Sequence, residues 1–196
     1  MNRWKALFIC IGCVALTACA NNQKLENVPL VWKPTVAPLG TSHDLAVMHL
    51  SPRSITVLPL QDQRSNRSLI GENREENVPR PITTSDNVAA FMTQHIRDLL
   101  AQAGYNIVDT NGQLELGGEV VSFFVPETGT YVGNVRIRAT LRSGNKVLWQ
   151  GTVGGTAEHF GRSYKAENYY ETLSDSLVQL VENLLRDPGF QKALGE

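Results

Sequence analysis

The residues of this chain that could act as nucleophiles or general bases are not spaced as catalysis requires. Ser42-His43-Asp44 spells the three residue types of a hydrolase triad in order. Neighbours in an extended chain point to opposite sides, however, and a triad is assembled by the fold from distant positions. Glu75 and Glu76 are adjacent carboxylates, whereas a glycosidase pair must converge across the scissile bond. We therefore expect no catalytic residue and predict that the protein is not an enzyme.

Metal, cofactor and nucleic-acid sites also lack the patterns that they require. The four histidines show no ligand spacing such as H-x-x-x-H. The chain has no glycine-rich phosphate loop, dinucleotide fingerprint or G-x-S-x-G motif. Its 18 basic and 19 acidic residues are interspersed, without a basic block. The sequence predicts no metal, no cofactor and no nucleic-acid partner.

One residue with definite chemistry is Cys19, the last of three cysteines, all of which lie near the start of the chain. It follows two basic residues, Arg3 and Lys5, and an apolar run from Ala6 to Ala18. That run is too short to cross a bilayer, which takes about 20 residues. It has the length of the apolar region of a secretory signal, about 7–15 residues. We predict a signal peptide over residues 1–18.

The end of this run, Leu16-Thr17-Ala18-Cys19, resembles the lipobox of bacterial lipoproteins. The resemblance implies that diacylglycerol is added to Cys19, that a peptidase cuts before it, and that the new amino terminus is acylated, with palmitate as the expected label. An ordinary signal followed by an incidental cysteine is the alternative, but such signals prefer a small residue where Leu16 stands. Ala20 is not the aspartate that favours inner-membrane retention in enterobacteria. We expect attachment to the outer membrane, facing the periplasm.

Four segments are expected along the chain. Residues 1–18 form the signal that is removed, and residues 19–27 form the lipidated cysteine and a short polar tether. Residues 28–52 are rich in proline yet carry apolar side chains, so we expect this segment to dock on the domain. Residues 53–196 form a single periplasmic α+β domain.

The hydrophobic pattern of this domain predicts two helices and several strands. Helical spacing begins at Val88 and again at about Ala166, and each stretch ends at a glycine signal. We predict an antiparallel sheet of four to six strands with two main helices packed on one face, in the order β-α-β-β-β-β-α. Residues 61–83 are expected to form a long polar loop. A three-residue turn, 143–145, is expected to set Ala139 opposite Trp149.

The clearest alternation in the chain produces a stripe of arginines. Val135, Ile137, Ala139 and Leu141 alternate with polar residues. The arginine stripe on the opposite side consists of Arg136, Arg138 and Arg142. Two roles stay open for it: binding of a partner, or cross-strand pairing with Glu115 and Glu119.

Several short motifs, in their order and spacing, resemble the YajG-like family of bacterial outer-membrane lipoproteins. They are Asp62-Gln63-Arg64, Ile70-Gly71, Leu99-Leu100 with Gly104-Tyr105, Gly133-Asn134-Val135-Arg136 and Leu173-Ser174-Asp175-Ser176-Leu177. The resemblance covers the chain from the Val28-Pro29 region to its end. It implies a periplasm-facing lipoprotein without known enzymatic activity, with Asp62 and Arg64 as signature residues of unknown role. A turn stabilised by a charge pair would explain these two residues equally well.

The function expected from these features is non-catalytic binding or scaffolding in the cell envelope. The membrane is the first partner, reached through the lipid on Cys19, and an envelope protein or the cell wall is the second. An activator of a cell-wall synthase and a peptidoglycan-binding module are the alternatives. The first usually has a longer tether than residues 20–27 provide, and the second lacks a visible OmpA-like motif.

Overall fold

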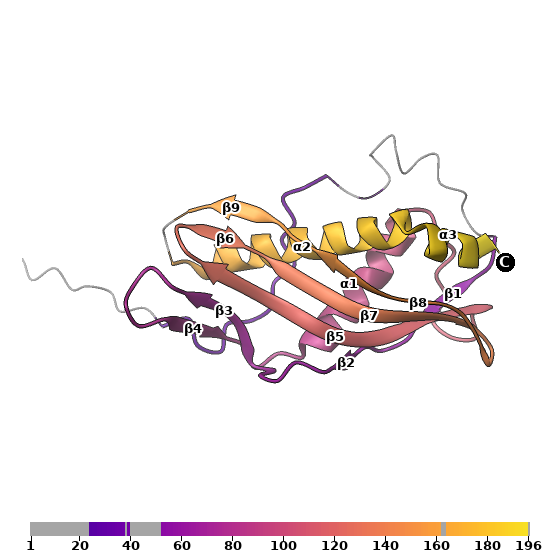
Figure 1. Cartoon of the computed structure of the whole chain (residues 1–196), viewed down its shortest axis with the longest axis horizontal. Helices are drawn as coiled ribbons and strands as arrows, with labels where there is room; N and C mark the ends of the chain where they lie inside the picture. Colours follow the sequence, from indigo (N-terminus) through magenta and orange to yellow (C-terminus); the bar gives the residue numbers. More distant parts are fainter. Residues whose placement is uncertain (1–23, 38, 40–51, 162–163, 196) are drawn as a thin grey trace, which may run out of the picture.

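The computed structural model describes residues 24–37, 39, 52–161 and 164–195. Their elements follow one another as four strands, a helix, five strands and two helices (Figure 1). The strands are β1 (Ile55–Val57), β2 (Gln61–Asp62), β3 (Leu69–Asn73), β4 (Arg80–Thr83), β5 (Leu114–Glu127), β6 (Thr130–Val132), β7 (Asn134–Ser143), β8 (Lys146–Gly155) and β9 (Glu158–Phe160). The helices are α1 (Val88–Gln102), α2 (Ala166–Arg186) and α3 (Pro188–Gly195).

The long strand β5 organises the sheet. It pairs in parallel with β1, β2 and β3, and antiparallel with β6 and β7. β8 continues the sheet beyond β7, β4 lies beside β3, and β9 lies beside β6. Nine strands thus form one sheet around a single 14-residue strand.

The predicted α+β class is confirmed, but the predicted number and direction of the strands are wrong. The sheet has nine strands instead of four to six, and three of them run parallel to β5. The chain passes from β1 to β5 through α1, and a strand–helix–strand connection returns the second strand in the direction of the first. The tight hairpin β7–β8 suggested antiparallel pairing throughout, which fails where β1, β2 and β3 pair with β5.

The predicted loop 61–83 is also wrong, because this segment contains β2, β3 and β4. Ile70 and Ile82 are fully buried in it. Pro81 lies in β4, which pairs only with β3 among the named strands, and proline is tolerated in edge strands. Short strands with at most one buried apolar side chain each leave no periodic signal in the sequence.

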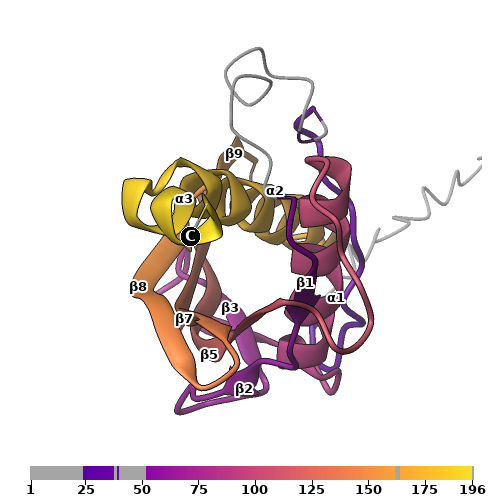
Figure 2. The ribbon, with the colours of Figure 1, turned by 90° about the vertical axis from the view of Figure 1, so that its right-hand side faces the viewer.

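The helices form where capping and apolar spacing favour them. The Asn87 side chain accepts a hydrogen bond from the Ala90 amide, which caps α1. α2 lies along β5, β7 and β8, whereas α1 contacts β1, β2 and α2 (Figures 1 and 2). The alternating apolar residues of β7 are all buried, on the side of the strand that α2 contacts, and its three arginines are exposed.

The β7–β8 hairpin differs from the expected register. Its turn has two residues, Gly144 and Asn145, because Ser143 pairs with Lys146. A bulge beside Leu141 then sets Leu141 opposite Trp149, and Ala139 opposite Gly151. The Trp149 ring is half-buried and packs against Phe190 of α3, with the ring centroids 5.1 Å apart.

The segment before β1 lies on the domain over residues 24–37. The amide of Val28 donates to the Thr83 carbonyl, and the Thr83 amide donates to the Leu25 carbonyl. Leu25 and Val28 are buried, so the attached chain begins within the range for which the sequence predicts a tether. Further along, the Trp32 ring stacks on His95 of α1 at 4.1 Å.

Candidate functional site

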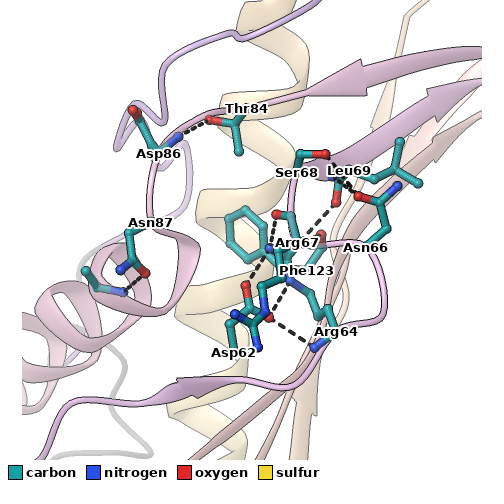
Figure 3. Close-up of polar contacts among 11 residues, drawn as sticks. Asp62, Arg64, Asn66, Arg67, Ser68, Leu69, Thr84, Asp86, Asn87 and Phe123 are labelled. Atoms are coloured by element: carbon teal, nitrogen blue, oxygen red, sulfur yellow. Dashed lines mark hydrogen bonds and ion pairs between the residues drawn. The ribbon is translucent and has the colours of Figure 1, made fainter.

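The signature pair Asp62 and Arg64 forms a nearly buried ion pair at the end of β2. The Arg64 Nε donates to Asp62 Oδ1 at 3.0 Å, and its Nη2 donates to Oδ2 at 2.8 Å (Figure 3). Only 7% of the Arg64 side chain and 12% of the Asp62 side chain are exposed. This two-pronged geometry is the strongest form of an arginine–carboxylate contact.

The rest of the Arg64 guanidinium binds backbone carbonyls. Its Nη1 donates to Leu69 at 2.9 Å and to Phe123 of β5 at 3.4 Å, and its Nη2 also donates to Arg67. A guanidinium has five N–H groups, and these contacts engage all five. Arg64 therefore ties residues 62–69 to β5 and has no donor left for a ligand.

Hydrogen bonding also determines the charge state of this pair. Burial alone would raise the pKa of Asp62, but the hydrogen bonds from the Arg64 side chain and amide outweigh it and hold the pKa below its usual value. Asp62 is thus an ionised acceptor and a poor proton donor. The pair has the geometry of a structural clamp, and general acid–base chemistry is not supported there.

The arginine stripe lies on the outer side of the sheet, at the edge of a shallow hollow of about 500 Å³. Arg138 contacts Glu119 at 2.6 Å, and Arg142 lies opposite Glu115 in the strand register. Arg136 lies opposite Ser122, so no carboxylate faces it across the strands. The cross-strand pairing is therefore present for Arg138, while all three arginines stay accessible to solvent.

The chemistry of this outer hollow is polar and balanced in charge. It is lined by Leu58, Pro59, Gln61, Glu115, Gly117, Gly118, Glu119, Arg138, Thr140, Arg142 and Gln150. Two carboxylates, two guanidinium groups and two amides offer hydrogen bonds in both directions. The lining contains no aromatic ring on which a sugar would stack, and no nucleophile beside a base. Such a surface suits a polar partner.

A second polar cluster, which the sequence did not single out, lies where residues 33–36 cross α2. The buried Asp175 carboxylate accepts from the Thr35 amide at 2.7 Å, from the Thr35 hydroxyl at 2.5 Å and from the Val36 amide. Its Oδ2 also lies 2.8 Å from His159 Nε2. A neighbouring hollow of about 320 Å³ is lined in part by Val178 and Glu182.

This cluster does not have the geometry of a catalytic triad. In a triad the histidine bridges the hydroxyl and the carboxylate, whereas here Asp175 lies between Thr35 and His159. The Thr35 hydroxyl donates to the carboxylate, and His159 contacts the carboxylate and not the hydroxyl. Asp175 is a carboxylate within the apolar stripe of α2, and this was the signal in the sequence from which the cluster could have been found. In the structure it binds the N-terminal segment.

Two tyrosines pack in the core. Tyr131 and Tyr169 are fully buried, with their ring centroids 5.1 Å apart. The Tyr169 hydroxyl donates to the buried Glu127 at 2.5 Å, and burial, together with this carboxylate, raises the pKa of Tyr169. These rings are not available as a platform for a sugar.

Within the described ranges, no three His, Cys, Asp or Glu residues are grouped as metal ligands. None of the helices described is both long and apolar enough to span a membrane. Cys19 and Ser42-His43-Asp44 lie outside the described residues, so the structure has no bearing on them.

Comparison with known families adds an independent observation. Residues 50–195 match the model of a family described as uncharacterized lipoprotein. The chain belongs to this family of lipoproteins. No curated protein matches it.

Solved structures resemble this lipoprotein in fold. One is the crystal structure of protein XCC0632 from Xanthomonas campestris, a DUF330 protein, at 14% identity and a TM-score of 0.56, covering 81% of this chain and 94% of that one. Another, an uncharacterized protein, has 12% identity and a TM-score of 0.50, covering 71% of this chain and 94% of its own. At such identities the likeness concerns the fold alone.

Proposed function

We propose that this lipoprotein is anchored by lipid on Cys19 to the outer membrane, faces the periplasm, and binds an envelope protein without catalysing a reaction. We also infer that it is a YajG-like lipoprotein. Membership of a lipoprotein family and the Leu16-to-Cys19 motif support the anchor. The observation that carries the binding role is the exposed outer hollow, lined by Arg138 and Arg142 of the arginine stripe, opposite the buried side of β7.

Rigidity favours this hollow as the binding surface. Its polar side chains project mainly from β5 and β7, which pair over most of their length. A partner that docks on ordered strands loses less conformational entropy than one that must order a loop. Residues 62–69, which border the same sheet, are fixed by Arg64 and add no ordering cost.

The anchor is tested with variants of the signal cysteines. Cys19→Ala should abolish palmitate incorporation and leave the precursor uncleaved at this position. Cys10→Ala lies in the same signal, upstream of the proposed cleavage site, and should leave labelling intact. Palmitate labelling that survives in Cys19→Ala would overturn the proposed attachment.

The binding surface is tested by crosslinking in cells. Thr152 is an exposed residue of β8 that pairs with Arg138 of β7. A photoreactive amino acid at this position should capture a partner. Reversal of two charges by Arg136→Glu and Arg138→Glu should remove that product, while Lys146→Glu at the distant turn should not. The thermal midpoint should stay nearly constant, because an exposed ion pair contributes about 0–1 kcal/mol.

The outcomes of this experiment separate the alternatives. A crosslinked cell-wall synthase would support the activator role, and a product that a muramidase digests would support the peptidoglycan module. A fall in the thermal midpoint with an unchanged crosslink would show that the arginines serve only as structural partners of Glu115 and Glu119.

A further inference from the structure

Two apolar side chains are exposed to an unusual degree in this domain. Phe160 of β9 is 85% exposed, and Val78, between β3 and β4, is 74% exposed. The other exposed large apolar side chains of the described residues range from 39% to 47%. Single exposed apolar residues are common on protein surfaces, so their position in the fold decides whether they have a role.

Both side chains lie at the end of the sheet where β5 finishes. Phe160 pairs with Thr130, the first residue of β6, directly after the β5–β6 turn. The Arg74 amide donates to the carbonyl of Glu127, the last residue of β5, so the β3–β4 turn that carries Val78 begins there as well. Figure 1 shows these turns and β9 together at the left-hand end of the molecule.

The described chain also begins at this end. The Leu25 amide lies 3.4 Å from the Tyr164 hydroxyl. The guanidinium of Arg80, a residue that pairs with Asn73 at the end of β3, lies 4.2 Å from the centre of the Tyr164 ring. Only five residue steps separate Lys24 from Cys19, and an extended chain covers about 3.3–3.6 Å per residue, or about 18 Å.

Charge at this end does not favour an electrostatic contact. Arg74 pairs with Glu72, Arg80 with Glu76, and Lys24 with Glu26. A polybasic surface would be attracted to anionic lipids. Here the three basic residues are paired, and Glu75 and Glu158 are exposed carboxylates, so apolar contact is the available interaction. Phenylalanine is well suited to the interface between lipid headgroups and acyl chains.

We propose that this end of the domain rests on the membrane surface, with Phe160 and Val78 entering the interfacial layer of the lipid. The inference rests on the proposed anchor at Cys19, because the lipid holds the start of the domain within reach of the bilayer. The domain then stands with β5 directed toward the membrane. The β7–β8 turn lies at the other end, about 43 Å away, because the 14 residues of β5 span 13 steps of about 3.3 Å each.

The test uses the mature lipidated protein in vesicles of phosphatidylethanolamine and phosphatidylglycerol. After signal cleavage its single cysteine is Cys19, which carries lipid, so a new cysteine provides one thiol for an environment-sensitive fluorophore. Phe160→Cys and Val78→Cys place the label at the proposed contact. Asn145→Cys, in the β7–β8 turn, is the matched control at the other end.

Labels at positions 160 and 78 should shift to shorter emission wavelengths and be quenched by nitroxide-bearing lipids, and the label at position 145 should show neither change. Blue-shifted labels without lipid quenching would mean that a second copy of the protein covers this end. Equal quenching at all three positions would mean that the domain lies flat, and either result overturns the proposal. If the fluorophores keep the emission of an aqueous environment while palmitate labelling depends on Cys19, the proposed membrane contact is refuted and the proposed lipid anchor is retained. Loss of that Cys19 dependence would instead refute the anchor.

Discussion

A single arginine holds several separate pieces of this domain together. Arg64 neutralises a nearly buried carboxylate and closes the backbone of residues 62–69 against β5. The family resemblance marked this residue and Asp62, but the sequence alone did not distinguish a binding role from a turn. The structure favours the turn, because each donor of Arg64 already has an acceptor within the protein.

Removal of Arg64 should therefore destabilise the domain strongly. Arg64→Ala leaves three carbonyls without their donor and the Asp62 carboxylate with only the backbone amide of residue 64. Loss of one partner of a buried pair typically costs about 3–5 kcal/mol. Arg138→Ala removes an arginine from an exposed pair and should cost about 1 kcal/mol or less. Urea unfolding monitored by circular dichroism measures both. Equal losses for the two variants would contradict the clamp.

The same pair predicts a loss of stability in acid. The folded-state pKa of Asp62 lies below its usual value, so the unfolded chain binds the proton more readily. The contribution of Asp62 is then fully present above the unfolded pKa of about 3.9, and it is lost as the pH falls through the lower folded value. The difference in unfolding free energy between the wild type and Asp62→Asn should shrink below about pH 4. A difference that stays constant with pH would show that folding does not lower the pKa of Asp62.

At the level of elements, α2 approaches the sheet closely because small residues face it. A Cβ at Gly133 would overlap Ser176 of α2, and a Cβ at Gly155 would overlap the backbone of Ser176 and Leu180. The apolar stripe of α2 could be recognised in the sequence, as could the alternation of β7. The close approach could not, because it depends on which glycines the sheet places beneath the helix.

Gly155→Ala should therefore separate α2 from β8 and lower stability. Overpacking of a dense interface typically costs about 1–3 kcal/mol, and here backbone atoms on both sides resist the shift. Thr152→Ala, at an exposed position on the same strand, should change the unfolding free energy by no more than about 0.5 kcal/mol. Thermal unfolding of both variants provides the comparison. An unaltered midpoint in Gly155→Ala would mean that the helix adjusts without loss.

Strand register shows the limit of sequence reasoning at this scale. The alternation along β7 correctly predicted which residues face inward, because it depends only on the period of two. The pairing with β8 was wrong because a bulge beside Leu141 and a two-residue turn together displaced Trp149 from its expected partner. Such irregularities depend on local backbone energies and leave no pattern in side-chain polarity.

In the arrangement that we propose, the lipoprotein as a whole has an anchored end and a free end, joined by β5. The N-terminal segment crosses both helices: Trp32 stacks on His95 of α1, and Thr35 binds Asp175 of α2. A lipid anchor attached to such a segment would be coupled to the body of the domain, so the orientation of the outer hollow would follow from how the segment is held.

Asp175 should be the main attachment of this segment. In Asp175→Ala, the amides of Thr35 and Val36 lose their shared acceptor, and the hydroxyl of Thr35 loses its partner. Hydrogen exchange of residues 33–36 should then accelerate far more than exchange in β7, whose bonds to β5 and β8 are untouched. Glu171→Gln weakens only a partly exposed pair with Lys33 and should leave exchange of this segment nearly unchanged. If residues 33–36 keep their protection in Asp175→Ala, the aromatic stack on His95 and not the carboxylate holds the segment, and the coupling between the anchor and the domain passes through α1.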